Sequence, residues 1–239
     1  MIDWKKVQAR LGVPADGVAG PRTYAALLKF ASHGRVDPAL AAQMAAICVV
    51  SISKHAIDAT ANRLGQFLAT TPHETGDFTV FSENLNYSVA NILAAWGPGH
   101  GGRFRSAADA APYAHNPRAL AEKVYSYAAR GGTKYDLGNR PGTTDAYDMR
   151  GGGWIQTTGY SNYLRAEKVT GLPLTAHPEL LHDPLTSIEP ACAYWQGSGC
   201  NELADADPTG RRARIKVNGG TIGLADVLQR VPRMMGILV

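Results

Sequence analysis

Two glutamates nine residues apart are the side chains best suited to chemistry. Glu74 follows an apolar stretch of helical spacing, and Glu83 begins the string Glu-Asn-Leu-Asn-Tyr-Ser. In one unbroken helix the two carboxylates would lie on opposite faces, about 13 Å apart along the axis. Gly76 is a natural helix stop, so the chain after it can double back and bring both carboxylates to one cleft. Glycoside hydrolysis needs such a pair, because one carboxylic acid protonates the leaving oxygen while the other carboxylate activates water or attacks the sugar.

A glycine-rich segment downstream carries polar and aromatic groups that suit a sugar. Three consecutive glycines allow close backbone approach, and the residues after them offer amide, hydroxyl and aromatic groups. Such groups orient hydroxyl-rich ligands, and flat rings cover the apolar face of a pyranose. These groups belong to Gln156, Thr158, Tyr160, Asn162 and Tyr163. The alternative interpretation is a turn that enters a packed helix, with both tyrosines in the core.

The segments that must position these groups have mostly helical spacing. Apolar residues recur every three or four positions in the ranges 39–50, 55–71, 187–195 and 221–228. Ranges 97–102 and 130–153 are rich in Gly, Pro, Asn and Asp and predict loops. The pattern therefore predicts a mainly α-helical protein with little strand. The uncharged run 38–53 is shorter than the ~20 residues of a membrane span and predicts a buried helix.

The first thirty residues predict two short helices around a turn. Residues 4–11 and 23–30 have helical spacing, and Asp16-Gly17-Val18-Ala19-Gly20-Pro21 supplies the turn, where the glycines allow positive φ. This stretch resembles the repeat of the helical peptidoglycan-binding domain. The other interpretation is a helical hairpin packed on the main body. A joint at 32–35 predicts an N-terminal element, 1–33, and a catalytic domain, 34–239.

Composition narrows the class of protein. The 239 residues are 45% hydrophobic and 18% charged, which excludes a disordered chain, and the net charge of +4 favours an anionic partner. Three cysteines cannot form a disulfide framework, so free thiols and a reducing compartment are expected. The basic run Arg211, Arg212, Arg214 and Lys216 suits either an anionic wall or a solvated helix face. No nucleic-acid motif or export signal is evident.

No cofactor or metal site is expected. His177 and His182 are five residues apart with Glu179 between them, but Pro178 interrupts the face on which helical ligands would align.

Four strings in this order resemble glycoside hydrolase family 19, which contains chitinases and phage endolysins. They are His73-Glu74-Thr75-Gly76, Glu83-Asn84-Leu85-Asn86-Tyr87-Ser88, the segment Gly151 to Tyr163, and Val217-Asn218-Gly219-Gly220. The short distance between the glutamates is most similar to the endolysin branch. The resemblance implies a bilobal, mainly α-helical, lysozyme-like fold with minor β structure, and cleavage of a β-1,4 linkage next to an N-acetylated sugar.

The resemblance also implies residue roles. Glu74 matches the general acid, Glu83 matches the general base of an inverting displacement, and Thr158 matches a residue that helps hold the water. The predicted substrate-binding residues are His73, Gln156, Asn162, Tyr163 and Asn218. For His73, orienting a loop through a hydrogen bond is the alternative role.

Three positions depart from the family pattern. Pro72 predicts a helix that kinks or ends just before Glu74. Gly152 stands where the family commonly has Arg, so a salt bridge to a carboxylate is expected to be missing. Trp154 stands where the family usually has Pro.

The sequence therefore predicts a monomeric endolysin that cuts peptidoglycan. We expect synthesis in the host cytoplasm and action in the periplasm or cell wall, after a separate holin-like protein permeabilises the membrane. No integral membrane segment and no nucleic-acid partner are expected. The alternatives are a chitinase of the same mechanism and a non-catalytic wall-binding protein.

Overall fold

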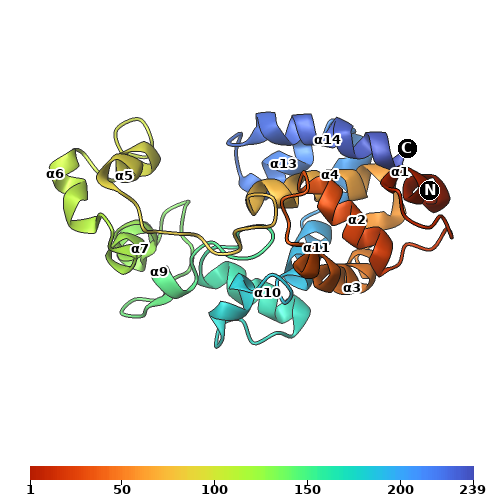
Figure 1. Cartoon of the computed structure of the whole chain (residues 1–239). Coiled ribbons are helices and arrows are strands. Elements are labelled where there is room, and N and C mark those ends of the chain that lie inside the picture. Colours follow the sequence, from red (N-terminus) through yellow and green to blue (C-terminus); the bar gives the residue numbers. More distant parts are fainter.

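The computed structural model describes residues 1–239 as a mainly α-helical protein, as the sequence predicts (Figure 1). The α-helices are α1 Trp4–Leu11, α2 Pro21–Ala31, α3 Pro38–Lys54, α4 Ala61–Glu74, α5 Val89–Trp96, α6 Ala107–Ala110, α7 Pro117–Tyr125, α8 Tyr127–Arg130, α9 Asp145–Asp148, α10 Tyr160–Thr170, α11 Ile188–Gly197, α12 Cys200–Ala206, α13 Arg211–Asn218 and α14 Leu224–Leu238. Three 3-10 helices are η1 Ile57–Ala59, η2 Ala111–Tyr113 and η3 Pro178–His182. The β structure consists of two isolated bridges, Ser82 with Gly152 and Gly152 with Thr157.

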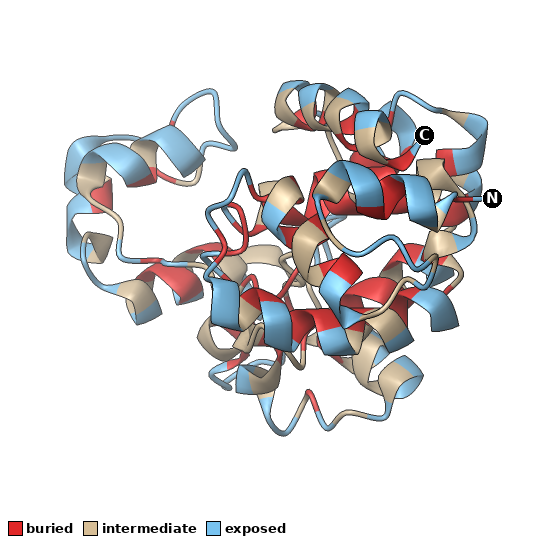
Figure 2. Ribbon diagram, turned by 45° about the vertical axis from the view of Figure 1, so that its right-hand side comes forward, coloured by how far each residue is buried: buried red, intermediate tan, exposed pale blue.

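The helices form two lobes, which lie on the right and left of Figure 1. The larger lobe has a core of 30 buried residues from α1–α4, α11–α14 and the segments between them. The smaller lobe has its own core of 8 residues, contributed largely by α5, α7 and the segments around them. Figure 2 shows buried residues concentrated on the inner faces of the helices in the larger lobe. The chain after α4 crosses from the larger lobe to the smaller one (Figure 1).

Helix α4 runs through the middle of the larger lobe and ends at Glu74. Every residue from 64 to 72 is buried, and the ring of Phe67 packs between Trp154 and Trp195. Helix α14 packs closely along α4, because a Cβ on Gly65 would lie 2.9 Å from the sulfur of Met235. The helix continues for two residues after Pro72. Of the two alternatives at Pro72, an end of the helix is therefore wrong, and a kink stays a prediction.

Helix α3 covers the uncharged run and faces the core. Its buried residues include Met44, Cys48 and Ile52. None of the helices in the structure combines the length and the apolar composition that crossing a membrane requires. All three cysteines, Cys48, Cys192 and Cys200, are buried free thiols.

The N-terminal helices form a hairpin around a polar turn. The buried side chain of Gln8 donates to Asp16 Oδ1 (2.8 Å), Val18 O (2.9 Å) and Thr23 Oγ1 (3.0 Å) and accepts from the Gly17 N–H (2.8 Å). Gly17 has a φ of +83°, whereas Gly20 has a φ of −87° and caps α2. The hairpin shares the core of the larger lobe with α3 and α4. Wall binding by residues 1–33 and a boundary at residue 33 stay predictions.

Candidate active site

A left-handed turn after α4 reverses the chain beyond Glu74. Gly76, Asp77 and Phe78 all have positive φ, at +54°, +65° and +61°. Such backbone is costly for the two residues that are not glycine, so other contacts must hold it. Phe78 is buried against Trp154, and Asp77 Oδ1 forms an ion pair with Arg230 Nη1 at 2.6 Å. The reversal predicted at Gly76 is present.

Glu74 is held by an arginine that comes from α13. Arg214 Nη1 forms an ion pair with Glu74 Oε1, and Arg214 Nη2 donates to Ile222 O at 2.8 Å. The Arg214 side chain is only 1% exposed, and that of Glu74 is 13% exposed. Glu74 Oε2 has no hydrogen-bond partner in the structure. One carboxylate oxygen is therefore fixed while the other is free to meet a ligand.

The position of Arg214 corrects one interpretation of the basic run. Arg211, Arg212 and Lys216 are exposed, as a solvated helix face predicts, but Arg214 is buried. Its partner Glu74 lies 140 residues earlier in the chain.

Glu83 is placed by the glycine-rich segment and by the smaller lobe. Its N–H donates to Gly151 O at 2.7 Å, which fixes the backbone. Tyr125 Oη donates to Glu83 Oε1 at 2.8 Å, and the Gly151 N–H donates to Oε2 at 3.2 Å. Burial raises the pKa of the Glu83 carboxyl, and these two hydrogen bonds and the charge of Arg150 oppose the rise. A carboxylate with a raised pKa is a stronger base than an exposed one.

A small pocket of about 250 Å³ opens beside Glu83. It is lined by Ser82, Glu83, Asn84, Leu85, Pro117, Tyr147 and Arg150. The half-buried Glu83 therefore borders open space.

Gln156 and Thr158 lie next to Glu83 around Gly151. A Cβ on Gly151 would lie 3.4 Å from Glu83 Cβ, 3.4 Å from Thr158 Oγ1 and 3.0 Å from Gln156 Oε1. Asn162 joins them, because its Nδ2 donates to Thr158 O at 2.7 Å. The structure thus brings four of the predicted site residues together, and Gly151 leaves the space they need.

His73 and Asn218 lie on the side of Glu74. His73 Nδ1 is 2.7 Å from Asp226 Oδ2, and a Cβ on Gly223 would be 2.0 Å from His73 Nε2. This hydrogen bond matches the loop-orienting alternative for His73. Asn218 is the exposed last residue of α13. Substrate contacts by both residues stay predictions.

Tyr163 has no face available to a sugar. Its ring is fully buried, its hydroxyl donates to Arg150 O at 3.0 Å, and His182 Nε2 lies 3.2 Å from that hydroxyl. The core alternative therefore describes Tyr163, which supports the glycine-rich segment from behind.

Gly152 has no room for the arginine common in the family pattern. A Cβ there would lie 2.5 Å from His182 Cδ2 and 3.0 Å from Tyr163 Oη. Arginines nevertheless approach both glutamates from other elements. Arg214 pairs with the side chain of Glu74, and Arg150 Nε donates to Glu83 O at 3.1 Å.

Trp154, which follows the three glycines, has its side chain in the core of the larger lobe. It is fully buried against Phe67 and Phe78, and its Nε1 donates to Pro184 O at 3.0 Å.

The histidines weighed as metal ligands do not converge. His177 Nδ1 lies 3.1 Å from Glu179 Oε1 on the surface, whereas His182 faces Tyr163. Burial lowers the pKa of His182 to about 4, so its imidazole is neutral at physiological pH. No group of three His, Cys, Asp or Glu side chains has the geometry to hold a metal ion.

Comparison with known proteins identifies the family. No protein-family profile matches the chain. A protein of Haemophilus influenzae (strain ATCC 51907 / DSM 11121 / KW20 / Rd), described as a glycosyl hydrolase family 19 domain-containing protein, is 31% identical over 159 residues, which cover 66% of this chain and 71% of that protein. The chain belongs to glycosyl hydrolase family 19.

Membership of family 19 makes the protein a glycoside hydrolase that acts on cell-wall or chitin-like glycans. The two carboxyl groups are the side chains that this chemistry requires, since both inverting and retaining glycosidases use such a pair.

Proposed function

We propose that this family 19 glycosidase is an endolysin, which hydrolyses β-1,4 linkages of bacterial peptidoglycan with inversion. The observation that carries the proposal is the unequal setting of Glu74 and Glu83 at the two ends of the chain reversal. One carboxyl is paired with a buried guanidinium, and the other is desolvated and hydrogen-bonded by Tyr125 and Gly151. Two carboxyls in different settings can take different proton-transfer roles, and the match of Glu74 and Glu83 to the family strings is what assigns the acid and the base.

Glu74 is the proposed general acid. It donates its proton to the glycosidic oxygen as the bond breaks, and the carboxylate that remains is stabilised by the adjacent Arg214. Because this stabilisation grows as the proton leaves, it favours the transition state over the ground state. The unpartnered Oε2 is the atom that reaches the leaving oxygen.

Glu83 is the proposed general base. Its desolvated carboxylate takes a proton from water, which then attacks the anomeric carbon from the face opposite the leaving group. Tyr125 and the Gly151 N–H hold the carboxylate oxygens in place. Thr158 Oγ1 lies beside Glu83 and is the proposed second contact of this water.

The choice of peptidoglycan rests on two features outside the carboxylates. The polar turn of the α1–α2 hairpin contains the string that resembles a peptidoglycan-binding repeat. The net charge of +4 also favours an anionic glycan over neutral chitin.

Release of reducing ends from purified sacculi tests the function. Wild type should solubilise sacculi, and Glu74→Gln should lower kcat by about 10²- to 10⁴-fold, the usual contribution of a positioned acid. Glu202→Gln, which changes an exposed glutamate of α12, is the matched control and should retain activity. Cleavage of chitin oligomers without cleavage of sacculi would make the protein a chitinase, and an active Glu74→Gln would refute the assignment of the acid.

We also propose that the protein acts as a monomer, is stored in the host cytoplasm, and reaches the wall after a holin-like protein opens the membrane. Three buried free thiols are compatible with storage in a reducing compartment. Expression in a bacterial host tests this: lysis should require co-expression of a membrane-permeabilising protein.

A further inference from the structure

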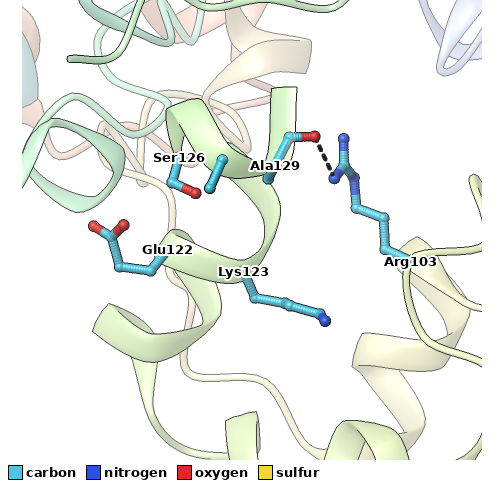
Figure 3. Close-up of a pocket in the computed structure, with 6 residues that line it drawn as sticks. Arg103, Glu122, Lys123, Ser126 and Ala129 are labelled. Atoms are coloured by element: carbon cyan, nitrogen blue, oxygen red, sulfur yellow. Dashed lines mark hydrogen bonds between the residues drawn. The ribbon is translucent and has the colours of Figure 1, made fainter. Parts of the chain in front are cut away.

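A second pocket, in the smaller lobe, is lined by two cationic side chains and does not include either of the two glutamates. It measures about 320 Å³ and is lined by Arg103, Glu122, Lys123, Ser126, Ala128 and Ala129 (Figure 3). Lys123 and Arg103 reach toward the same side of α7, whereas the carboxylate of Glu122 points to the other side (Figure 3). The only acidic residue of the pocket therefore does not neutralise its two cations.

Three cations of this region lack an ion pair. Arg103, Lys123 and Arg130 are each half-buried, and none of them forms an ion pair in the structure. Arg103 Nη1 donates to Ala129 O at 3.2 Å, and Arg130 Nε donates to Val124 O at 2.7 Å. These bonds cap the ends of α7 and α8, but each guanidinium has five N–H donors, so most of them stay free.

Lys123 has no hydrogen-bond partner at all. Its ammonium nitrogen lies 5.9 Å from the ring centre of Phe104 and 5.7 Å from that of Tyr113. The two rings hold the side chain over the smaller lobe without neutralising its charge. Burial is the main cause that lowers the pKa of Arg130, and the charge of Arg103 adds to it, whereas Glu83 opposes the shift. A bound anion would relieve the repulsion between Arg103 and Arg130.

The pocket adjoins Tyr125 in the chain, because Ser126, which lines it, follows the tyrosine that bonds Glu83. Arg130 lies over the ring of Tyr125, 5.1 Å from its centre, and the hydroxyl of the same tyrosine bonds Glu83. Tyr125 ends α7, the helix that carries Lys123. The pocket and the contact of Glu83 thus both belong to the end of α7, so a branch of a glycan bound at Glu83 is the candidate occupant of the pocket.

We propose that this pocket binds the free carboxylates of the peptide branches on the glycan. The inference rests on the proposed function, since peptidoglycan carries such branches on alternate sugars and chitin carries none. It makes Lys123 and Arg103 residues that determine substrate specificity, with no part in bond cleavage.

Binding of soluble glycan strands tests the proposal independently of catalysis. The strands keep their peptides and are compared before and after carbodiimide-mediated amidation, which converts the free carboxylates to neutral amides. Dissociation constants are measured with the Glu74→Gln protein as background, and cleavage by wild type is measured separately. Amidation should weaken binding two- to fivefold, the size expected of a partly screened ion pair.

Lys123→Met is the principal variant, because methionine keeps the aliphatic stem on the rings and removes the charge. It should bind charged strands two- to fivefold more weakly and lose less affinity on amidation than the background protein, since Arg103 remains. Lys134→Met is the matched control, since Lys134 also lies over a ring, that of Tyr135, but outside the pocket. The control should lose affinity on amidation as the background protein does.

Each result has a definite meaning. If Lys123→Met and the second variant Arg103→Met still respond to amidation like the background protein, the pocket proposal is wrong. If binding behaves as expected but wild type cleaves no sacculi, the proposed function fails while the carboxylate site stands.

Discussion

Replacing Arg214 by methionine removes the ion pair with Glu74 and leaves the surrounding packing largely in place. Methionine keeps much of the buried volume, so the main loss is the pairing of Glu74 with Arg214. Removing one partner of a buried ion pair costs about 3–5 kcal/mol. Because the Glu74 side chain remains 13% exposed, water can replace part of the interaction, and the lower end applies. The lost hydrogen bond to Ile222 O adds about 1 kcal/mol, which gives about 3–4 kcal/mol in total.

Urea denaturation of a double-mutant cycle measures the stability part. Arg214→Met, Glu74→Gln and the double variant are compared with wild type by tryptophan fluorescence. Arg214→Met should lower the free energy of unfolding less in the Glu74→Gln protein than in wild type. The difference should be at least about 1 kcal/mol. Additive effects within about 0.5 kcal/mol would refute the coupling.

Kinetics of Arg214→Met measure the catalytic part. We expect kcat on sacculi to fall by about 10²-fold, because the acid loses its position, while KM changes little, because Arg214 is buried and does not face substrate. An unchanged kcat, or a loss carried only by KM, would contradict the role of Arg214.

Three further outcomes follow from the geometry. Because the Tyr125 hydrogen bond opposes the raised pKa of Glu83 and the base must be deprotonated, Tyr125→Phe should move the acidic limb of kcat/KM to higher pH; a shift to lower pH would contradict this. Gly152→Ala should lower the free energy of unfolding by about 1–3 kcal/mol, because its Cβ would lie 2.5 Å from His182 Cδ2, and urea denaturation checks this. The first sugar product should carry the inverted anomer by NMR, whereas retention would exclude Glu83 as a base acting through water.

Helix positions were predictable because they follow local apolar spacing. The face of Trp4 and Val7 lies in α1 as predicted, and the stripe with Leu64 and Leu68 lies in α4. Pro72 made an early end of the helix one of two alternatives, because an interior proline costs stability in general. Here nine consecutive buried residues of α4 outweigh that cost.

Arg214 was missed because its partner is distant in the chain. A run of four basic residues on one helix looks solvated when only local sequence is considered. Helical spacing did not resolve it, because Arg214 shares a face both with the half-buried Val217 and with the exposed Arg211. Tyr125 was missed for the same reason as Arg214, since nothing in its surroundings marks a hydrogen bond to Glu83, 42 residues away.

The two glutamates are anchored to different parts of the molecule, and this decides what controls their separation. Glu74 ends α4 and is fixed by α13, so it moves with the larger lobe. Glu83 Oε1 is fixed by Tyr125, at the end of a helix whose buried residues belong to the core of the smaller lobe. Inversion needs carboxyls about 6.5–9.5 Å apart, to leave room for water. The arrangement of the lobes therefore sets the catalytic distance, and contacts such as the Tyr125 hydrogen bond position the base as well as tune its pKa.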